Sequence, residues 1–302
     1  YLALKALGIG QGDEVITSSH TFKATLSAII DTGAKPVLVD IKDDGLIDPD
    51  EVEKAITFKT KVIIPVHLAG ATCDMPEFNS IIAKEKMLNN KNLFILEDAC
   101  QAIDSKKNLL TGFKDVDYKT KTVSFPSGKY QEIEWEIRKA GNMMSEVGCF
   151  SFYPAKILGS VGDAGAITTN REDVYDYVRG ARNHFKETNE DMGGNYRLDN
   201  LQAVILRIRL KYIDEILARR KEIAERYLRE LRELEYQDFI KLPNNQIGRS
   251  WQDFILEIPE PEICGPYLVD EICIMCKPHN KCGAKNRNSL FEFLRKNEIE
   301  TI

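Results

Sequence analysis

The sequence has no hydrophobic run long enough to form a membrane-spanning helix. Such a helix needs about 18 or more consecutive apolar residues, and polar or charged residues interrupt every apolar stretch of this 302-residue chain before that length is reached. The first residues also lack a positively charged segment followed by an apolar core, which is the pattern of a secretion signal. We therefore expect a cytoplasmic protein without a membrane partner.

The chain also lacks an excess of positive charge. Its 41 Lys and Arg residues are outnumbered by 47 Asp and Glu residues, for a net charge of -6, and the basic residues do not gather into a stripe. A protein that binds a phosphate backbone needs such a basic surface, so nucleic acid is not an expected partner. Hydrophobic residues at 43% and charged residues at 29% are typical of an ordinary globular protein.

Regularly spaced cysteine pairs are missing as well. The seven cysteines are an odd number at irregular positions, which argues against a disulfide framework and favours reduced thiols. A pattern C-x2-C-x2-H-x2-C, with Cys264 close upstream, does bring together Cys273, Cys276, His279 and Cys282. These residue types are able to hold a structural zinc ion, but the long separation between ligand pairs is absent and such residues need no metal. Both interpretations stay open, and the metal-free one is favoured.

Short β-branched runs alternate with amphipathic stretches between residues 11 and 98. The runs DEVITS, KPVLVDI, KVIIPVHL and NLFILED predict strands, with helices between them. This alternation predicts an α/β fold with a mostly parallel central sheet flanked by helices. The length exceeds that of a usual single domain, so we expect a large domain over residues 1–215 and the start of a smaller α+β domain over residues 216–302.

Two stretches depart from this alternation, and both are predicted insertions: a polar, Lys-rich segment at about 105–146 and a second at about 259–287. Apolar residues at helical spacing predict a long helix or a kinked helix pair from 198 to about 234, and SWQDFILEI beyond it predicts a strand. The chain opens inside a helical pattern and stops where a strand begins, so further segments are expected on both sides.

The candidates for chemistry follow directly after predicted strands. Ligands of parallel sheets bind beyond the carboxyl ends of the strands, and in ILEDACQA a strand ends at Asp98, with Gln101 nearly one helical turn later. In FSFYPAK another strand ends near Ser151, and Lys156 follows on a turn. Taken one at a time, these residues have ordinary explanations as a helix cap, a surface amide, a strand serine and a solvated charge.

Taken together, the candidates match the needs of pyridoxal phosphate. That cofactor requires a lysine that bonds to its aldehyde and a carboxylate that keeps the pyridine nitrogen protonated. Lys156 and Asp98 are of these types, and Ser151 offers a hydroxyl to a phosphate group. The pair formed by Lys156 and Asp98 therefore favours a pyridoxal phosphate enzyme.

Several longer motifs carry a resemblance to a known family. The motifs are ALGIGQGDEVITSSHTFKAT, IIPVHLAG, ILEDACQA, FSFYPAK, GDAGAITTN, RNH and GGNYRLDNLQA, in this order along nearly the whole chain. They resemble the DegT/DnrJ/EryC1/StrS family of pyridoxal-phosphate-dependent aminotransferases, which build amino sugars on nucleotide carriers. The resemblance implies the aspartate-aminotransferase-like (type I) fold.

The resemblance also implies a role for each candidate residue. Lys156 would carry the cofactor and act as the catalytic base, Asp98 would face the pyridine nitrogen, Gln101 the phenolic oxygen and Ser151 the phosphate. Phe22 matches an aromatic residue that stacks on the cofactor ring. These five residues would form the cofactor site within one chain.

Three further residues come from the resemblance alone. Asn195 matches an asparagine that reaches the phosphate bound by a neighbouring subunit, which implies a homodimer with shared active sites. His184, in the motif RNH, and Arg197 are candidate substrate residues. The family's phosphate loop lies upstream of Tyr1 and is not part of this chain.

The implied reaction moves an amino group from L-glutamate to a keto group of a nucleotide-linked sugar. Relatives with histidine at the position of Lys156 dehydrate sugars instead, so a lysine here favours amino transfer. Two alternatives stay open: a non-catalytic regulatory relative, and an aminotransferase that acts on a keto-cyclitol or another acceptor without a nucleotide. The sequence does not identify the sugar, the carbon or the nucleotide.

Overall fold

A computed structural model describes residues 1–89, 91–109, 122–124, 130–132, 136–141, 145–187, 193–232, 241–244 and 246–257. The chain forms two compact units, the first made of Tyr1–Ala224 with Asn244–Phe254, and the second of Glu225–Pro243 with Ile255–Ile302. Much of the second unit lies outside the described residues, as do the predicted insertion at 259–287 and the four candidate zinc ligands. The predicted domain change near residue 215 therefore stays a prediction.

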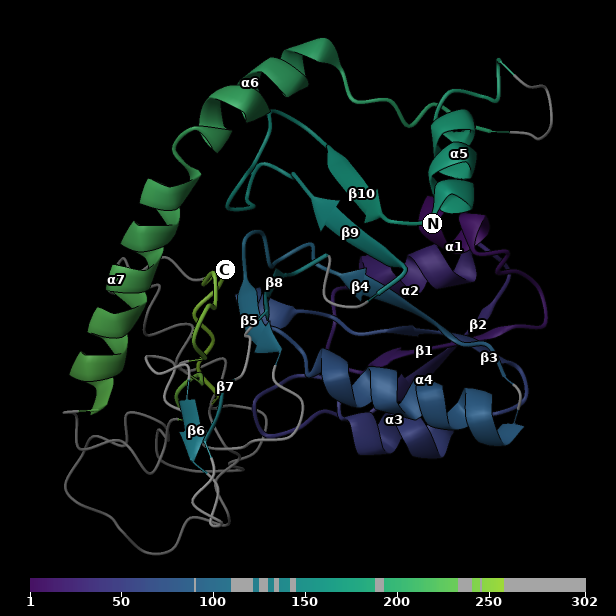
Figure 1. Cartoon of the computed structure of the whole chain (residues 1–302). Coiled ribbons are helices and arrows are strands. Elements are labelled where there is room, and N and C mark those ends of the chain that lie inside the picture. Colours follow the sequence, from purple (N-terminus) through teal and green to yellow (C-terminus); the bar gives the residue numbers. More distant parts are fainter. Residues whose placement is uncertain are drawn as a thin grey trace, which may run out of the picture. The chain divides into compact units, whose positions relative to one another are not determined.

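The first unit is built on a six-stranded sheet with the strand order β10-β9-β4-β3-β1-β2 (Figure 1). Neighbouring strands run parallel, except that β10 is antiparallel to β9. This confirms the predicted mostly parallel sheet. The strands are β1 (Glu14–Ser18), β2 (Lys35–Val39), β3 (Thr60–Ile64), β4 (Phe94–Asp98), β9 (Val147–Ser151) and β10 (Gly165–Thr169).

Helices cover both faces of this sheet, and each buries one of two hydrophobic clusters (Figure 1). Successive strand residues point to opposite faces, so Ile16 packs toward one cluster and Val15 toward the other. The central strands are buried on both sides, which explains why their sequences are continuous apolar runs. The first cluster includes residues of α3 (Pro49–Ala55) and α4 (Met75–Asn89), and the second includes residues of α1 (Leu2–Ala6), α2 (Lys23–Ile30) and α5 (Glu172–Ala181).

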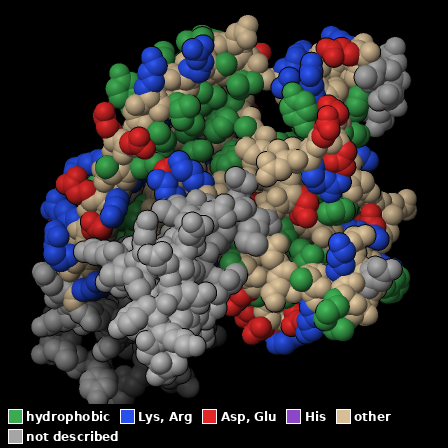
Figure 2. Space-filling model, in the orientation of Figure 1, with side chains coloured by type: hydrophobic (Ala, Val, Ile, Leu, Met, Phe, Trp, Pro, Cys, Tyr) green, Lys and Arg blue, Asp and Glu red, His purple; other side chains and the backbone are tan. Residues whose placement is uncertain are grey.

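Two helices, α6 (Asn200–Leu210) and α7 (Ile213–Arg232), follow the sheet. The sequence predicts a long helix or a kinked helix pair in this region, and the structure has the pair. A capping box between Asp199 and Gln202 begins α6, and it satisfies amide groups that the first turn would leave free. Leu201, Val204 and Ile208 of α6 are exposed, and Figure 2 shows apolar side chains at the surface of this helix. Among the described helices, none is both long enough and apolar enough to cross a membrane.

The predicted insertion at about 105–146 contributes two small sheets. In one, β5 (Lys106–Leu109) pairs with β8 (Glu136–Lys139), and in the other β6 (Thr122–Ser124) pairs with β7 (Tyr130–Glu132); both pairs are antiparallel. The ends of the segment belong to the core, because Ser105 and Ala140 are buried.

The strand predicted for SWQDFILEI is wrong for the residues that the structure describes. Residues 251–256 form no strand, and only Glu257 makes an isolated bridge, to Lys241. Trp251 has a φ of 55°, a left-handed conformation that interrupts extended pairing. Its ring is buried and stacks on Phe254, so the apolar residues pack as an irregular segment instead.

Candidate active site

The residues expected to carry chemistry gather at the carboxyl ends of neighbouring strands. Asp98 is the last residue of β4, and β9, the parallel neighbour of β4, ends at Ser151 just before the turn that carries Lys156. Thr25 of α2 reaches the same edge from the other side, because its hydroxyl group contacts Asp98. This edge of a parallel sheet is where ligands bind in such folds.

Asp98 is held in place by hydrogen bonds rather than by a cation. Thr25 Oγ1 donates to its Oδ2 atom at 2.8 Å, and the backbone amide of Cys100 donates to Oδ1 at 3.2 Å. The backbone of Asp98 also pairs with Pro65 and His67 beyond the end of β3. Within the described residues this half-buried carboxylate has no ion-pair partner, so a cationic N–H group of a ligand would complete its surroundings.

Gln101 is fixed by the three-residue turn η1 (Leu68–Gly70) that follows β3. The amide of Ala69 donates to Gln101 Oε1 at 2.6 Å. Because the side-chain oxygen is engaged in this way, the Nε2 group is oriented as a donor for a ligand oxygen. Ala69 itself has a φ of 52°, a left-handed backbone conformation that interrupts the helical turn.

Lys156 lies half-buried on a tight turn after β9. Its backbone amide donates to the carbonyl of Tyr153 at 2.8 Å, and the amide of Tyr153 donates to Ser151 Oγ at 3.3 Å. Gly159 closes the turn, because a Cβ atom there would lie 2.3 Å from the carbonyl oxygen of Pro154. The turn therefore brings Ser151 and Lys156 to one edge of the sheet.

The thiols of Cys100 and Cys149 lie near the carboxylate of Asp98. Burial, together with the nearby negative charge of Asp98, raises the pKa of Cys149 to about 12 and raises the pKa of Cys100 as well. Both thiols are consequently protonated at neutral pH, and a protonated thiol is a poor nucleophile. The lysine is the stronger candidate for covalent chemistry at this edge.

The residue before Asp98 belongs to a buried polar network. Glu97 Oε2 accepts from His67 Nε2 at 2.9 Å and from the amide of Gly141 at 2.7 Å, and Glu97 also contacts Ser145. His67 Nδ1 accepts from the amide of Cys73, so its ring proton lies on Nε2. Since breaking a buried polar pair costs several kcal/mol, this network fixes β4 just before the candidate site.

The remaining predicted residues lie on other parts of the first unit. Phe22 is the residue just before α2 and is 65% exposed, so it is not a core residue and is free to contact a ligand ring. His184, Asn195 and Arg197 lie on the exposed loop after α5, where Arg197 Nη1 donates to Asn183 Oδ1 at 2.8 Å. Their assignment to cofactor and substrate stays a prediction.

Sequence reasoning missed two residues that touch the site. Thr25 stands in the motif HTFKAT, one helical turn after Thr21, whose hydroxyl is 2.8 Å away; that spacing was the available signal. Gln252 stands far along the chain and hydrogen-bonds to the residues on both sides of Lys156. Nothing in the local sequence indicated that contact.

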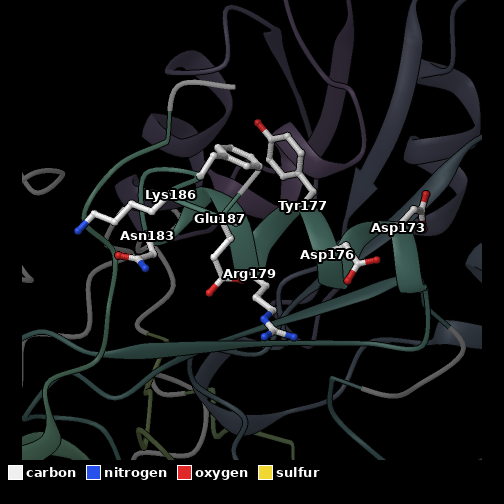
Figure 3. A pocket seen from close by; sticks show the side chains of 9 residues that line it. Asp173, Asp176, Tyr177, Arg179, Asn183, Lys186 and Glu187 are labelled. Atoms are coloured by element: carbon white, nitrogen blue, oxygen red, sulfur yellow. The ribbon is translucent and has the colours of Figure 1, made fainter. Parts of the chain in front are cut away.

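A separate cavity of about 540 Å³ lies beside α5 (Figure 3). Side chains of both charge signs line it, and neither Lys156 nor Asp98 is among them. Mixed charges of this kind are typical of a solvated surface. Across the described part of the chain no group of His, Cys, Asp and Glu residues is arranged to hold a metal ion.

Comparisons with known proteins point to one family. The model of the DegT/DnrJ/EryC1/StrS aminotransferase family matches residues 1–280. The chain is 36% identical, over 265 residues, to the dTDP-3-amino-3,4,6-trideoxy-alpha-D-glucose transaminase of Micromonospora megalomicea subsp. nigra, with 86% of this chain and 62% of that protein covered. It is 37% identical, over 280 residues, to a pleiotropic regulatory protein of Geobacillus stearothermophilus, with 90% and 65% covered.

Solved structures agree with this result. The crystal structure of NtdA from Bacillus subtilis with bound cofactor PMP matches with a TM-score of 0.68 and 32% identity, covering 86% of this chain and 52% of that one. The architecture is therefore that of the aminotransferase fold. The chain spans between 52% and 65% of the length of these three proteins.

Proposed function

Because the chain belongs to the DegT/DnrJ/EryC1/StrS aminotransferase family, we propose that the whole protein is a pyridoxal-phosphate-dependent transaminase. It moves an amino group from L-glutamate to a keto group of a nucleotide-linked sugar, in the cytoplasm. The observation that carries this proposal is the position of Asp98 and Lys156 after two neighbouring parallel strands, with an aspartate that has no cation partner among the described residues. That donor set fits the cofactor.

Each residue of the set has a task in this reaction. Pyridoxal phosphate, when bound, supplies an electrophilic carbon and a ring that accepts electrons. Asp98 would hold a proton on the ring nitrogen, and Thr25 would keep the Asp98 carboxylate oriented through its 2.8 Å hydrogen bond. Lys156 Nζ would bind the cofactor covalently and, once displaced by glutamate, would remove the proton from the glutamate Cα atom.

The acceptor is proposed from the relatives. The Micromonospora relative is named for a dTDP-linked amino sugar, and that name supports a keto-sugar nucleotide as the substrate class here. A keto-cyclitol, which lacks a nucleotide, remains the competing acceptor. We propose that the polar loop bearing His184 and Arg197 determines which of these two acceptors binds.

A regulatory function is the competing class, because the Geobacillus relative is named a pleiotropic regulatory protein. A protein without catalysis has no chemical need for a lysine, a carboxylate and an amide at one edge of the sheet. Asp98, Gln101, Ser151 and Lys156 are all present here, and this supports the enzyme.

We also propose that two copies of the protein form the active unit. The resemblance assigns Asn195 to the neighbouring subunit's cofactor, and this side chain is exposed. The exposed apolar residues of α6 offer a surface that a partner would cover (Figure 2), since large exposed apolar patches mark contact surfaces.

The change in the absorption spectrum when an amino donor is added tests the proposed function. The full-length protein mixed with pyridoxal phosphate is expected to show a visible absorption band that L-glutamate removes, because the amino group passes to the cofactor. D-Glutamate is the matched control. Its Cα–H bond would point away from Lys156, so it should leave the band unchanged. A protein that binds no cofactor, or a band that is indifferent to L-glutamate, would favour the regulatory alternative.

A further inference from the structure

A short segment near residue 250 contacts two loops of the candidate site. Residues 246–252, which we call the strap, belong to the same compact unit as the sheet. At one end the strap hydrogen-bonds to Thr72 beyond η1, and at the other it reaches the turn that carries Lys156. The strap thus joins the β3 side of the site to the β9 side.

Gln252 holds the lysine turn with its side-chain amide. The backbone amide of Ile157 donates to Gln252 Oε1 at 3.0 Å, and Gln252 Nε2 donates to the carbonyl of Ala155 at 3.2 Å. These two residues flank Lys156, so a single side chain bonds to the backbone immediately before and after the lysine. Gln252 is only 8% exposed, so water does not readily replace either bond.

The backbone of Gln252 is itself held by hydrogen bonds. Arg220 Nη1 donates to the carbonyl oxygens of Trp251 at 3.0 Å and of Gln252 at 3.1 Å. Burial lowers the pKa of Arg249 to about 10, so that side chain remains charged at neutral pH, and it lies 4.3 Å from the centre of the Trp251 ring. The Gln252 side chain therefore projects from an anchored main chain.

The other end of the strap is packed equally closely. Gln246 bonds to the amide of Thr72 at 2.7 Å and to its carbonyl at 2.9 Å. The amide of Ser250 donates to the carbonyl of Gly70 at 3.2 Å, and a Cβ atom on Gly70 would lie 2.4 Å from Ser250 Oγ. Gly70 ends η1, the turn whose Ala69 amide fixes Gln101.

We propose that Gln252 is a positioning residue, which sets the place of the Lys156 amine by fixing the backbone on both sides of it. A lysine side chain is long and flexible, so the position of its backbone decides where its amine can stand. A displacement of about 1 Å in a reacting group can cost about 100-fold in rate. This inference rests on the proposed function in one respect: that Lys156 is the lysine that binds the cofactor and acts as the base.

Two glutamines of the strap allow a matched comparison in the full-length protein. Gln252→Met keeps the size of the side chain and removes both bonds to the lysine turn, whereas Gln246→Met removes three bonds to Thr72. We expect Gln252→Met to lower kcat by about tenfold or more, with KM for L-glutamate nearly unchanged, because the amine is misplaced and not absent. Gln246→Met should change kcat by less than about twofold, since none of the three lost bonds reaches the lysine turn.

A spectral readout separates positioning from general stability. The pH midpoint of the visible band reports the surroundings of the lysine-bound cofactor, so it should shift in Gln252→Met and stay in place in Gln246→Met. Equal effects of the two substitutions on kcat and on this midpoint would overturn the proposal. Gln252→Glu still accepts from the Ile157 amide but has no donor for the Ala155 carbonyl, so its kcat is expected to lie between those of Gln252→Met and the wild type.

Amide hydrogen exchange tests the bonds between Gln252 and the lysine turn, and it needs neither a variant nor turnover. In the cofactor-free full-length protein, the Ile157 amide is expected to exchange slowly, as a buried bonded amide does. Exchange at the rate of an unstructured peptide would overturn the proposal even if the variants do not fold. If the Ile157 amide exchanges slowly but the protein has no transaminase activity, the bond to Gln252 is supported and the proposed function is contradicted.

Discussion

A Lys156→Ala variant is expected to lose turnover by at least about 10²–10⁴-fold, the contribution of a well-placed general base. Alanine has no amine to bind the cofactor covalently or to move the glutamate Cα proton, and no other described lysine is placed on the turn after β9. The measurement is the steady-state release of 2-oxoglutarate by the full-length protein with its keto-sugar acceptor.

The control for this variant is Lys61→Ala. Lys61 is an exposed residue near the start of β3, at the opposite end of the strand from the site, so turnover should stay close to the wild-type rate. Turnover of Lys156→Ala within about tenfold of wild type would contradict the general-base role, because that role requires a larger loss.

An Asp98→Asn variant is expected to lose about 10²–10³-fold in kcat, the usual cost of removing one electrostatic contact from a reacting group. Asparagine has nearly the same shape, and its side chain can accept from the Cys100 amide through Oδ1 and donate to the Thr25 hydroxyl through Nδ2, but it carries no negative charge to hold a proton on the ring nitrogen. The fold should therefore remain intact while the chemistry slows. Single-turnover rates with L-glutamate measure this step directly.

The matched control is Asp31→Asn, which removes one negative charge at the exposed end of α2. Its rate should equal that of the wild type. If Asp98→Asn reacts as fast as this control, the carboxylate does not face the cofactor and its contact with Thr25 is only structural.

The sheet and its helices could be predicted from the sequence because their patterns are local. The buried strands are continuous runs rich in β-branched residues, such as VII in β3, and the helices between them show a period of 3.6 residues. The same spacing predicts the helical region that forms α6 and α7, although it leaves open whether one helix or two are present. Lys156 and Asp98 could be singled out as candidates because each follows directly after a strand.

The strap could not be predicted, because its contacts are not local. Gln252 and Ile157 are 95 residues apart, and no periodic pattern records such a contact. The apolar residues of SWQDFILEI favoured a strand, whereas tertiary packing of Trp251 in a left-handed conformation prevented it. Thr25 was missed for a related reason: its partner Asp98 is 73 residues away.

The most direct test of the central claim is to find which residue carries the cofactor. Full-length protein loaded with pyridoxal phosphate is reduced with borohydride, which makes the lysine–cofactor bond permanent, then digested and examined by mass spectrometry. We predict that the added mass lies on Lys156, in the peptide containing FYPAKILG, and that L-glutamate added before reduction prevents the labelling. Labelling of another lysine, or none at all, would contradict the assignment of this site.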